Sequence, residues 1–232
     1  FTNNWQDELW LVAGGIFGGS LYFFTENTAL GITQASNVSF IICTAPLLTT
    51  ILSLLFYKSE KASKGLIYGS LLALMGVGLI VFNGSFVLKI SPIGDLLTLL
   101  AALSWAFYSL IIKKMARRYP TVFITRKIFF YGVLTILPAF LLHPLHPDTA
   151  VLLQPAVLFN LLFLAVLASL ICYVLWNVVL KQLGTVRASN YIYLNPLVTM
   201  IASFLILDEK ITLVALGGAA CIVCGVYWAE KK

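Results

Sequence analysis

The sequence predicts an all-α protein that spans a membrane, and three observations point to this fold class. Hydrophobic residues make up 60% of the 232-residue chain and charged residues only 10%, whereas soluble domains average about 45–50% apolar residues. The apolar stretches are long and lack the period-two alternation of membrane β-strands. Two sets of these stretches also resemble each other, which indicates an internal repeat.

Eight stretches are long enough for membrane-spanning helices, which need about 20 apolar residues each. We expect these helices at residues 8–32, 35–57, 64–83, 92–112, 121–142, 156–181, 188–207 and 210–229. The connections between them are short, so no soluble domain is expected.

Basic residues collect on one side of the predicted bundle. The opposite side holds only Lys89 and Lys210. Basic loops face the cytoplasm, so we expect a multi-pass protein of the cytoplasmic membrane with its C-terminus inside. The net charge of +6 is then a topology signal, and no nucleic acid is expected as a partner. The basic residues on the side of the N-terminus are Lys58, Lys61, Lys64, Lys113, Lys114, Arg117, Arg118, Lys181, Arg187, Lys231 and Lys232.

Cysteine and histidine give no pattern of a metal or disulfide site. His143 and His146 lie in a predicted outer loop without clustered partners. The cysteines all fall inside predicted spans, where small packing residues are common: Cys43, Cys172, Cys221 and Cys224. No cofactor and no metal is expected.

The first three spans repeat as the last three. Because the copies start at the first and sixth spans, an odd offset makes them enter the membrane from opposite sides. Inverted repeats of this kind are typical of transporters. At an offset of 150 residues, and of 149 after one deletion, the matches include Asn27 with Asn177, Ser39 with Ser189, Pro46 with Pro196, Gly69 with Gly218, and Gly76 with Gly225.

Three runs of the chain resemble the EamA family of the drug/metabolite transporter (DMT) superfamily: TALGITQASNVSFIICTAPLLTTILSLLF, GDLLTLLAALSWAFYSLIIKK and YVLWNVVLKQLGTVRASNYIYLNPLVTMIASFLILDEKIT. The resemblance implies two inverted five-helix repeats and transport of small metabolites, often amino acids. It assigns residues 8–83 to the last three helices of the first repeat, 84–91 to an outer linker and 92–232 to the complete second repeat. The first two helices of the first repeat are absent, and the chain begins with Phe1. We expect an N-terminally truncated chain, with a natural eight-helix form as the alternative.

Polar and aromatic side chains concentrate in four of the predicted spans, where they need internal partners or water. Aromatics mixed with amides suit a small organic ligand, and we expect them to line a substrate site between the spans. The alternative for each is an interfacial belt or a hydrogen bond between helices. The candidates are Tyr22, Glu26, Asn27, Trp105, Tyr108, Tyr173, Trp176, Asn177, Tyr193 and Asn195.

Prolines and glycines mark special backbone positions within the spans. Pro46 and Pro196 each remove a backbone hydrogen bond, and we interpret them as hinges, with fixed kinks as the alternative. The GGIFGG stretch at residues 14–19 and the glycines of the third and eighth spans are expected to pack against neighbouring helices.

Two ionisable residues within the spans receive separate interpretations. Arg126 either extends its stem toward the cytoplasmic face or binds an anionic group of the substrate. Glu26 is expected about 9 Å from the middle of its helix, still inside the hydrocarbon, where a charged carboxylate is unfavourable. We expect it to bind and release a proton as the coupling ion, or else to lie in the interface.

The function predicted from these observations is secondary active transport, expected to be export, of a small metabolite by alternating access. An enzyme is not expected, because no nucleophile or metal cluster is found. The sequence has no G-x-x-x-x-G-K loop for direct use of ATP. The alternative is a channel-like or structural membrane protein without coupled transport.

Overall fold

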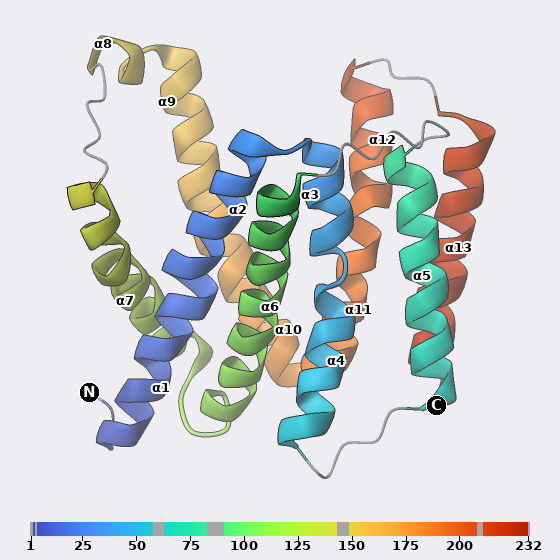
Figure 1. The fold of residues 1–232 in the computed structure, drawn as a ribbon. Coiled ribbons are helices and arrows are strands. Elements are labelled where there is room, and N and C mark those ends of the chain that lie inside the picture. The colour runs from blue at the N-terminus through green and yellow to red at the C-terminus, as the bar shows by residue number, and fades with distance from the viewer. Residues whose placement is uncertain are drawn as a thin grey trace.

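All secondary structure in the part of the chain that the structure describes is helical (Figure 1). The computed structural model describes residues 2, 4–57, 63–82, 91–142, 149–207 and 211–231. The elements are α1 (Trp5–Gly15), η1 (Ile16–Ser20), α2 (Leu21–Ile32), α3 (Ala35–Ile42), α4 (Ala45–Phe56), α5 (Lys64–Phe82), α6 (Pro92–Met115), α7 (Thr121–Leu142), α8 (Thr149–Leu152), α9 (Pro155–Leu162), η2 (Phe163–Ile171), α10 (Cys172–Leu183), α11 (Thr185–Asn190), η3 (Tyr191–Leu194), α12 (Asn195–Leu207) and α13 (Leu213–Glu230).

Seven helical stretches of the described chain are long and apolar enough to cross a membrane: Ala35–Phe56, Lys64–Phe82, Pro92–Met115, Thr121–Ala139, Pro155–Leu183, Thr185–Ile206 and Leu213–Glu230. They correspond to seven of the eight predicted spans. The remaining one, predicted at residues 8–32, is a continuous helix through α1, η1 and α2 but is not among the seven. Asp7, Glu8 and Glu26 make it less apolar than its neighbours.

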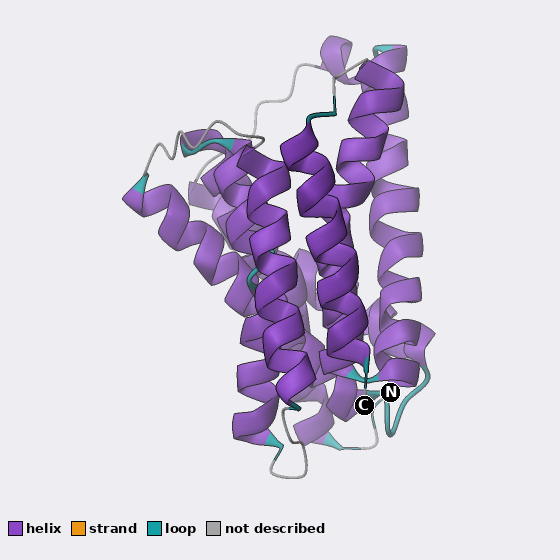
Figure 2. Cartoon of the chain, turned by 90° about the vertical axis from the view of Figure 1, so that its right-hand side faces the viewer, coloured by secondary structure: helices purple, strands orange, loops and turns teal. Residues whose placement is uncertain are grey.

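The helices at the start of the chain and those that follow residue 154 run in opposite directions. In Figure 1, α1 and α2 rise from the end where the N-terminus lies, whereas α9 and α10 descend toward it. Both chain ends lie at this end of the molecule (Figures 1 and 2). The predicted linker residues 84–90, both histidines, and Lys58, Lys61, Lys89 and Lys210 lie outside the described residues.

Interruptions of the helices recur at corresponding positions. The first pair is π-helical: η1 separates α1 from α2, and η2 separates α9 from α10. In the second pair, a turn at residues 43 and 44 separates α3 from α4, and the 3-10 turn η3 separates α11 from α12. An offset of 150 residues carries each interruption of the first copy into that of the second.

The two prolines predicted as kinks lie at breaks between helices. Pro46 is the second residue of α4, and Pro196 is the second residue of α12. Proline fits the first turn of a helix because its missing N–H has no role there. The Ile192 carbonyl, four residues before Pro196, accepts the backbone N–H of Asn195. The chain thus breaks here and starts a new helix, where a bent helix was expected.

Glycines bring α5 and α13 into backbone contact, as predicted. A Cβ atom added at Gly69 would lie 2.4 Å from the carbonyl oxygen of Gly225, and one at Gly76 would lie 2.5 Å from that of Gly218. At Gly217, by contrast, an added Cβ atom would have no atom of another helix within 4 Å, so this glycine is not in close contact with a neighbouring helix. The predicted repeat pairs Gly69 with Gly218 and Gly76 with Gly225. The two contacts join the same four glycines, but with the partners exchanged.

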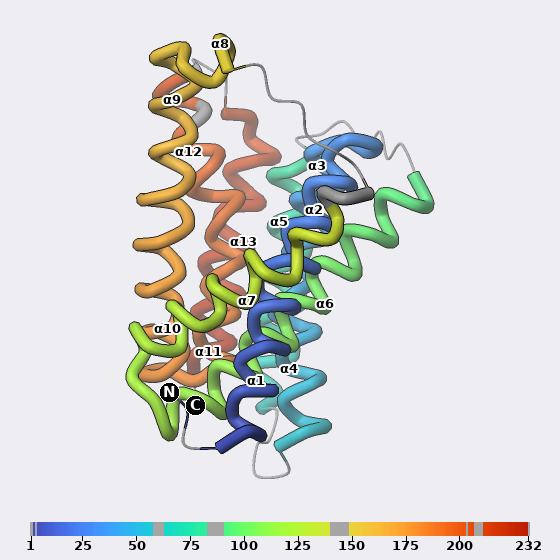
Figure 3. The backbone as a smooth tube through the Cα atoms, turned by 90° about the vertical axis from the view of Figure 1, so that its left-hand side faces the viewer, coloured from blue at the N-terminus to red at the C-terminus, as the bar shows by residue number. Residues whose placement is uncertain are grey.

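Another close contact joins the first helix to α7, which crosses α1 obliquely (Figure 3). A Cβ atom at Gly15 would lie 2.8 Å from the backbone nitrogen of Gly132. Near the end with both termini, the carboxylate of Glu8 accepts from Lys127 at 2.6 Å. This ion pair joins the start of α7 to α1.

Candidate functional site

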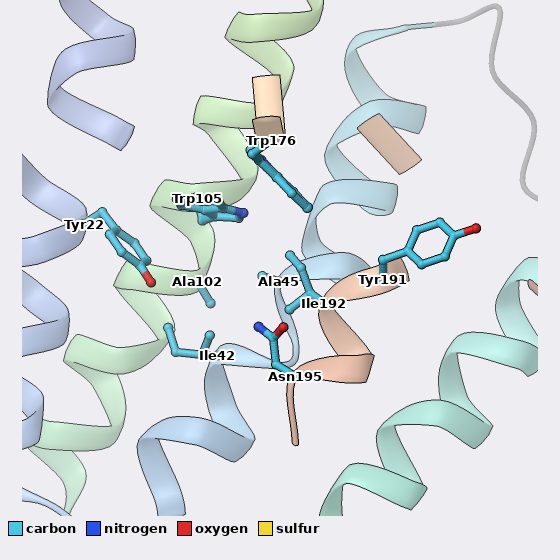
Figure 4. A pocket seen from close by; sticks show the side chains of 9 residues that line it. All are labelled: Tyr22, Ile42, Ala45, Ala102, Trp105, Trp176, Tyr191, Ile192 and Asn195. Carbon is cyan, nitrogen blue, oxygen red and sulfur yellow. The ribbon is translucent and has the colours of Figure 1, made fainter. Parts of the chain in front are cut away.

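A cavity of about 260 Å³ lies at the level of the two helix breaks (Figure 4). Its walls come from α2, from α3 and α4 around their break, from α6 and α10, and from η3 and the start of α12. The lining residues are Tyr22, Ile42, Ala45, Ala102, Trp105, Trp176, Tyr191, Ile192 and Asn195.

The breaks supply four of these lining residues in matching pairs. Ile42 and Ala45 lie four residues and one residue before Pro46, and Ile192 and Asn195 hold the same positions before Pro196. Each proline lies in the first turn of a new helix, and the irregular turn before it presents residues that a continuous helix would direct elsewhere. The proline positions are therefore the sequence signal that could have identified Ile42, Ala45 and Ile192.

Two tryptophans form one wall of the cavity, and Trp105 directs a hydrogen-bond donor into it (Figure 4). The rings of Trp105 and Trp176 have centroids 5.8 Å apart. The Nε1 atoms of both are buried and have no acceptor among the described residues. An indole nitrogen can only donate, and a buried donor without an acceptor is unfavourable. Figure 4 shows the nitrogen of Trp105 and the amide of Asn195 directed into the cavity, while the ring of Tyr191 points away from it. An oxygen atom of a bound ligand would satisfy such donors.

Glu26 is connected to the cavity by a hydrogen bond with the lining residue Tyr22. The Tyr22 hydroxyl donates to the Glu26 carboxylate at 3.0 Å, and the Tyr22 ring packs against that of Trp105 at 5.1 Å between centroids. Glu26 is partly buried and is not itself a lining residue. A change in the charge of Glu26 would therefore be transmitted to the cavity by one hydrogen-bonded side chain.

Three other predicted site residues lie together outside the cavity lining. The hydroxyl of Tyr108 donates to Asn177 Oδ1 at 2.7 Å, and Asn177 Nδ2 donates to Thr125 Oγ1 at 2.9 Å. The hydroxyl of Tyr173 donates to the carbonyl of Gly18 at 2.8 Å. Asn177 is only 1% exposed. These bonds join α6, α7, α10 and η1, so they hold in place the helices that carry Trp105 and Trp176.

The remaining predicted site residues lie apart from the cavity. Asn27 is exposed on α2, and Arg126 is exposed on α7, with its guanidinium carbon 5.4 Å from the centre of the Phe123 ring. Tyr193 is fully buried in the cluster between α5, α13 and η3. Of the predicted residues, the structure brings Tyr22, Trp105, Trp176 and Asn195 together around one cavity.

Known proteins resemble this chain over most of its length. A 30% identical protein of Archaeoglobus fulgidus, named "Uncharacterized transporter", aligns with 93% of this chain and 73% of its own length. A protein of Salmonella typhimurium named "Probable amino-acid metabolite efflux pump" is 29% identical, over 74% of this chain and 60% of its own length. A solved structure, described only as "Crystal structure of protein", superposes with a TM-score of 0.81 at 19% identity and covers 98% of this chain and 77% of that one.

A family match also covers most of the chain. The sequence pattern of the EamA-like transporter family matches residues 1–82 and 92–229. With the helical fold, the cavity between broken helices and relatives named as transporters, this match places the protein among multi-pass membrane transporters. The chain belongs to the EamA-like transporter family.

Proposed function

We propose that this protein is a secondary active transporter that moves a small metabolite across the cytoplasmic membrane by alternating access. The observation that carries the proposal is the 260 Å³ cavity between two helix breaks at corresponding positions of oppositely directed helices. Breaks of this kind at the centre of inverted repeats form substrate sites in transporters. Pro46 and Pro196 are the proposed hinges, because each lies where a new helix begins after an irregular turn.

The inverted repeat belongs to this proposal, and packing supports it. The contact of Gly69 with Gly225 becomes that of Gly218 with Gly76 when the copies are exchanged, and both contacts exist. A pseudo-twofold axis between the copies accounts for this reciprocity. Under such symmetry, a shape closed toward one side of the membrane has a counterpart closed toward the other.

The proposed substrate is a small metabolite with an apolar body and a polar oxygen-bearing group, such as an amino acid. The cavity volume of 260 Å³ is below the range of about 300–1,000 Å³ for drug-sized ligands. The donors of Trp105 and Trp176 and the amide of Asn195 would bind the polar group. The relatives named as efflux pumps of amino-acid metabolites support export as the direction.

Counterflow in proteoliposomes tests this proposal. Vesicles containing the protein are loaded with one unlabelled amino acid or organic anion at a time, and uptake of the same labelled compound is followed. A carrier gives transient accumulation for a subset of compounds, and empty vesicles give none. Flux without counterflow would support the channel-like alternative, and no flux for any compound would support a structural role.

Proton coupling through Glu26 is part of the proposal and predicts a change in pH dependence. The Glu26→Gln variant keeps a side chain that can accept from Tyr22 but cannot titrate. We expect the dependence of transport on pH to flatten and gradient-driven accumulation to fail, while exchange persists. The Tyr22→Phe variant retains the carboxylate and should retain a pH-dependent rate. A Glu26→Gln profile that matches the parent would exclude this residue as the coupling group.

The proposed orientation places both chain ends in the cytoplasm, because described basic residues surround that end of the molecule. Pro120→Cys lies in the turn after α6, and Gln154→Cys lies before α9 at the opposite end. On intact cells, an impermeant thiol reagent should label the Gln154→Cys variant and leave Pro120→Cys at the level of the parent protein. The reverse labelling pattern would invert the orientation.

A further inference from the structure

A second, larger cavity of about 640 Å³ lies near the end that holds both termini, between α1, α4 and α6. In Figure 1 the lower part of α6 lies between those of α1 and α4, and α6 packs against both helices. This cavity shares no lining residue with the 260 Å³ cavity, so the proposed transport site does not account for it. Its walls are formed by Trp10, Ala13, Phe17, Phe56, Tyr57, Phe107, Leu110, Ile111, Lys114, Arg117 and Arg118.

Aromatic side chains form the apolar part of this second cavity, which we call the aromatic wall, and some of them are exposed on the outer face of the protein. Phe107 stands between Phe17 and Phe56, with ring centroids 5.3 Å and 6.3 Å away. Phe56 is 64% exposed and Trp10 is 40% exposed. In a membrane protein, such side chains on the outer face meet acyl chains and not water. The cavity is therefore accessible from the lipid.

The polar part is a basic rim at the membrane surface. Lys114 and Arg117 have no acidic partner within the described residues. The Lys114 ammonium lies 3.7 Å from the centre of the Trp10 ring, and Lys113 lies 4.3 Å from that of Tyr57. Arg118 donates to Asp7 at 2.8 Å through one nitrogen, which leaves other N–H groups of its guanidinium for a ligand. The rim thus has an excess of positive charge.

We propose that the second cavity binds one anionic phospholipid from the leaflet at this end of the molecule. Its phosphate would be held by Arg117 and Lys114, since guanidinium and ammonium groups bind phosphate by charge-assisted hydrogen bonds. One acyl chain would lie along the aromatic wall. Basic pockets between helices at the cytoplasmic surface bind anionic headgroups by this chemistry. A free phosphate ion would use the rim but leave the aromatic wall empty, so the pairing of both features favours a lipid.

The test compares lipid binding by the purified protein and by two charge-matched double variants. Lys114→Gln with Arg117→Gln removes the rim, and Lys181→Gln with Lys231→Gln removes the same charge from exposed positions at the same end. Binding of phosphatidylglycerol and phosphatidylcholine is measured by native mass spectrometry, with vesicles of each lipid as the source. We expect the parent and the control variant to prefer phosphatidylglycerol, and the rim variant to bind it about 10-fold more weakly, because each basic residue near an anionic lipid strengthens binding several-fold.

Three results would overturn the proposal: an equal loss in both double variants, no preference for phosphatidylglycerol in the parent, or displacement of the lipid by an equal concentration of inorganic phosphate. The first would mean unspecific attraction of lipid to charge, and the last would mean a site for free anions. Circular dichroism of each variant checks the helical fold, which should stay intact because Arg117, Lys181 and Lys231 are exposed and Lys114 is only partly buried.

Discussion

Replacing Gly225 by leucine is expected to separate α13 from α5 and to lower the free energy of unfolding by about 3 kcal/mol or more. Even a Cβ atom at this position would lie 2.5 Å from both the backbone nitrogen of Ala73 and the carbonyl oxygen of Gly69. Both atoms belong to the backbone of α5, so no side-chain rotation can relieve the overlap. The helices would have to move apart, and the neighbouring close contact of Gly76 with Gly218 would be lost as well.

The matched control is Gly217→Leu, eight residues earlier on the same helix. Nothing lies within 4 Å of a Cβ atom at Gly217, and leucine favours a helix over glycine by about 0.5–1 kcal/mol. Thermal unfolding in detergent should therefore show the Gly217→Leu variant as stable as the parent or more so, with Gly225→Leu well below both. Similar losses in the two variants would mean that α5 and α13 are not in backbone contact.

Removing the two indole donors from the cavity is expected to weaken substrate transport by about 10-fold for each donor, and by about 100-fold together. A hydrogen bond to a polar ligand is worth about 1 kcal/mol, and more when the acceptor is charged, and about 1.4 kcal/mol corresponds to a factor of ten. Trp105→Phe and Trp176→Phe keep an aromatic ring but lose the N–H. The effect should appear as a raised KM, because the donors bind the substrate before it is moved.

Trp228→Phe provides the control, since Trp228 is 53% exposed on the outer face of α13 and lines neither cavity. Transport by this variant should equal that of the parent protein. The unfolding temperatures of all three single variants are measured in parallel, because phenylalanine is smaller than tryptophan. If KM is unchanged in Trp105→Phe and Trp176→Phe, or if transport falls only in proportion to folded protein, the indole groups do not bind substrate.

The sequence predicted backbone features of the protein better than it predicted where side chains point. Residue patterns were sufficient for the helical fold and for the packing role of Gly69 and Gly225, because apolar length and missing side chains act locally. Residue patterns could not show which of Asn177 and Asn195 faces the cavity, because both are amides within apolar spans. That distinction depends on which way each helix faces, and Asn177 turns toward Tyr108 and Thr125 while Asn195 lies at a break and faces the cavity.

Contacts between distant segments were also beyond sequence reasoning. The pairs of Asp7 with Arg118 and of Glu8 with Lys127 join residues more than 100 positions apart, and nothing in the local sequence of either partner specifies the other. The wider turn of η1 was not predicted either, because sequence reasoning treats each span as a regular helix of 3.6 residues per turn.

That wider turn determines where the first span can lose a residue without changing the direction of its side chains. In η1 the N–H of Leu21 bonds to the carbonyl of Ile16, five residues earlier, so the turn holds one residue more than an α-helical turn. One residue corresponds to about 100° around the helix axis. Deleting a single residue within η1 would restore a regular helix and leave Tyr22 and Glu26 facing nearly the same way relative to Asp7 and Glu8, whereas a deletion within the regular part of α1 would rotate them by about 100°. The η1 segment should thus tolerate a one-residue deletion better than α1 does.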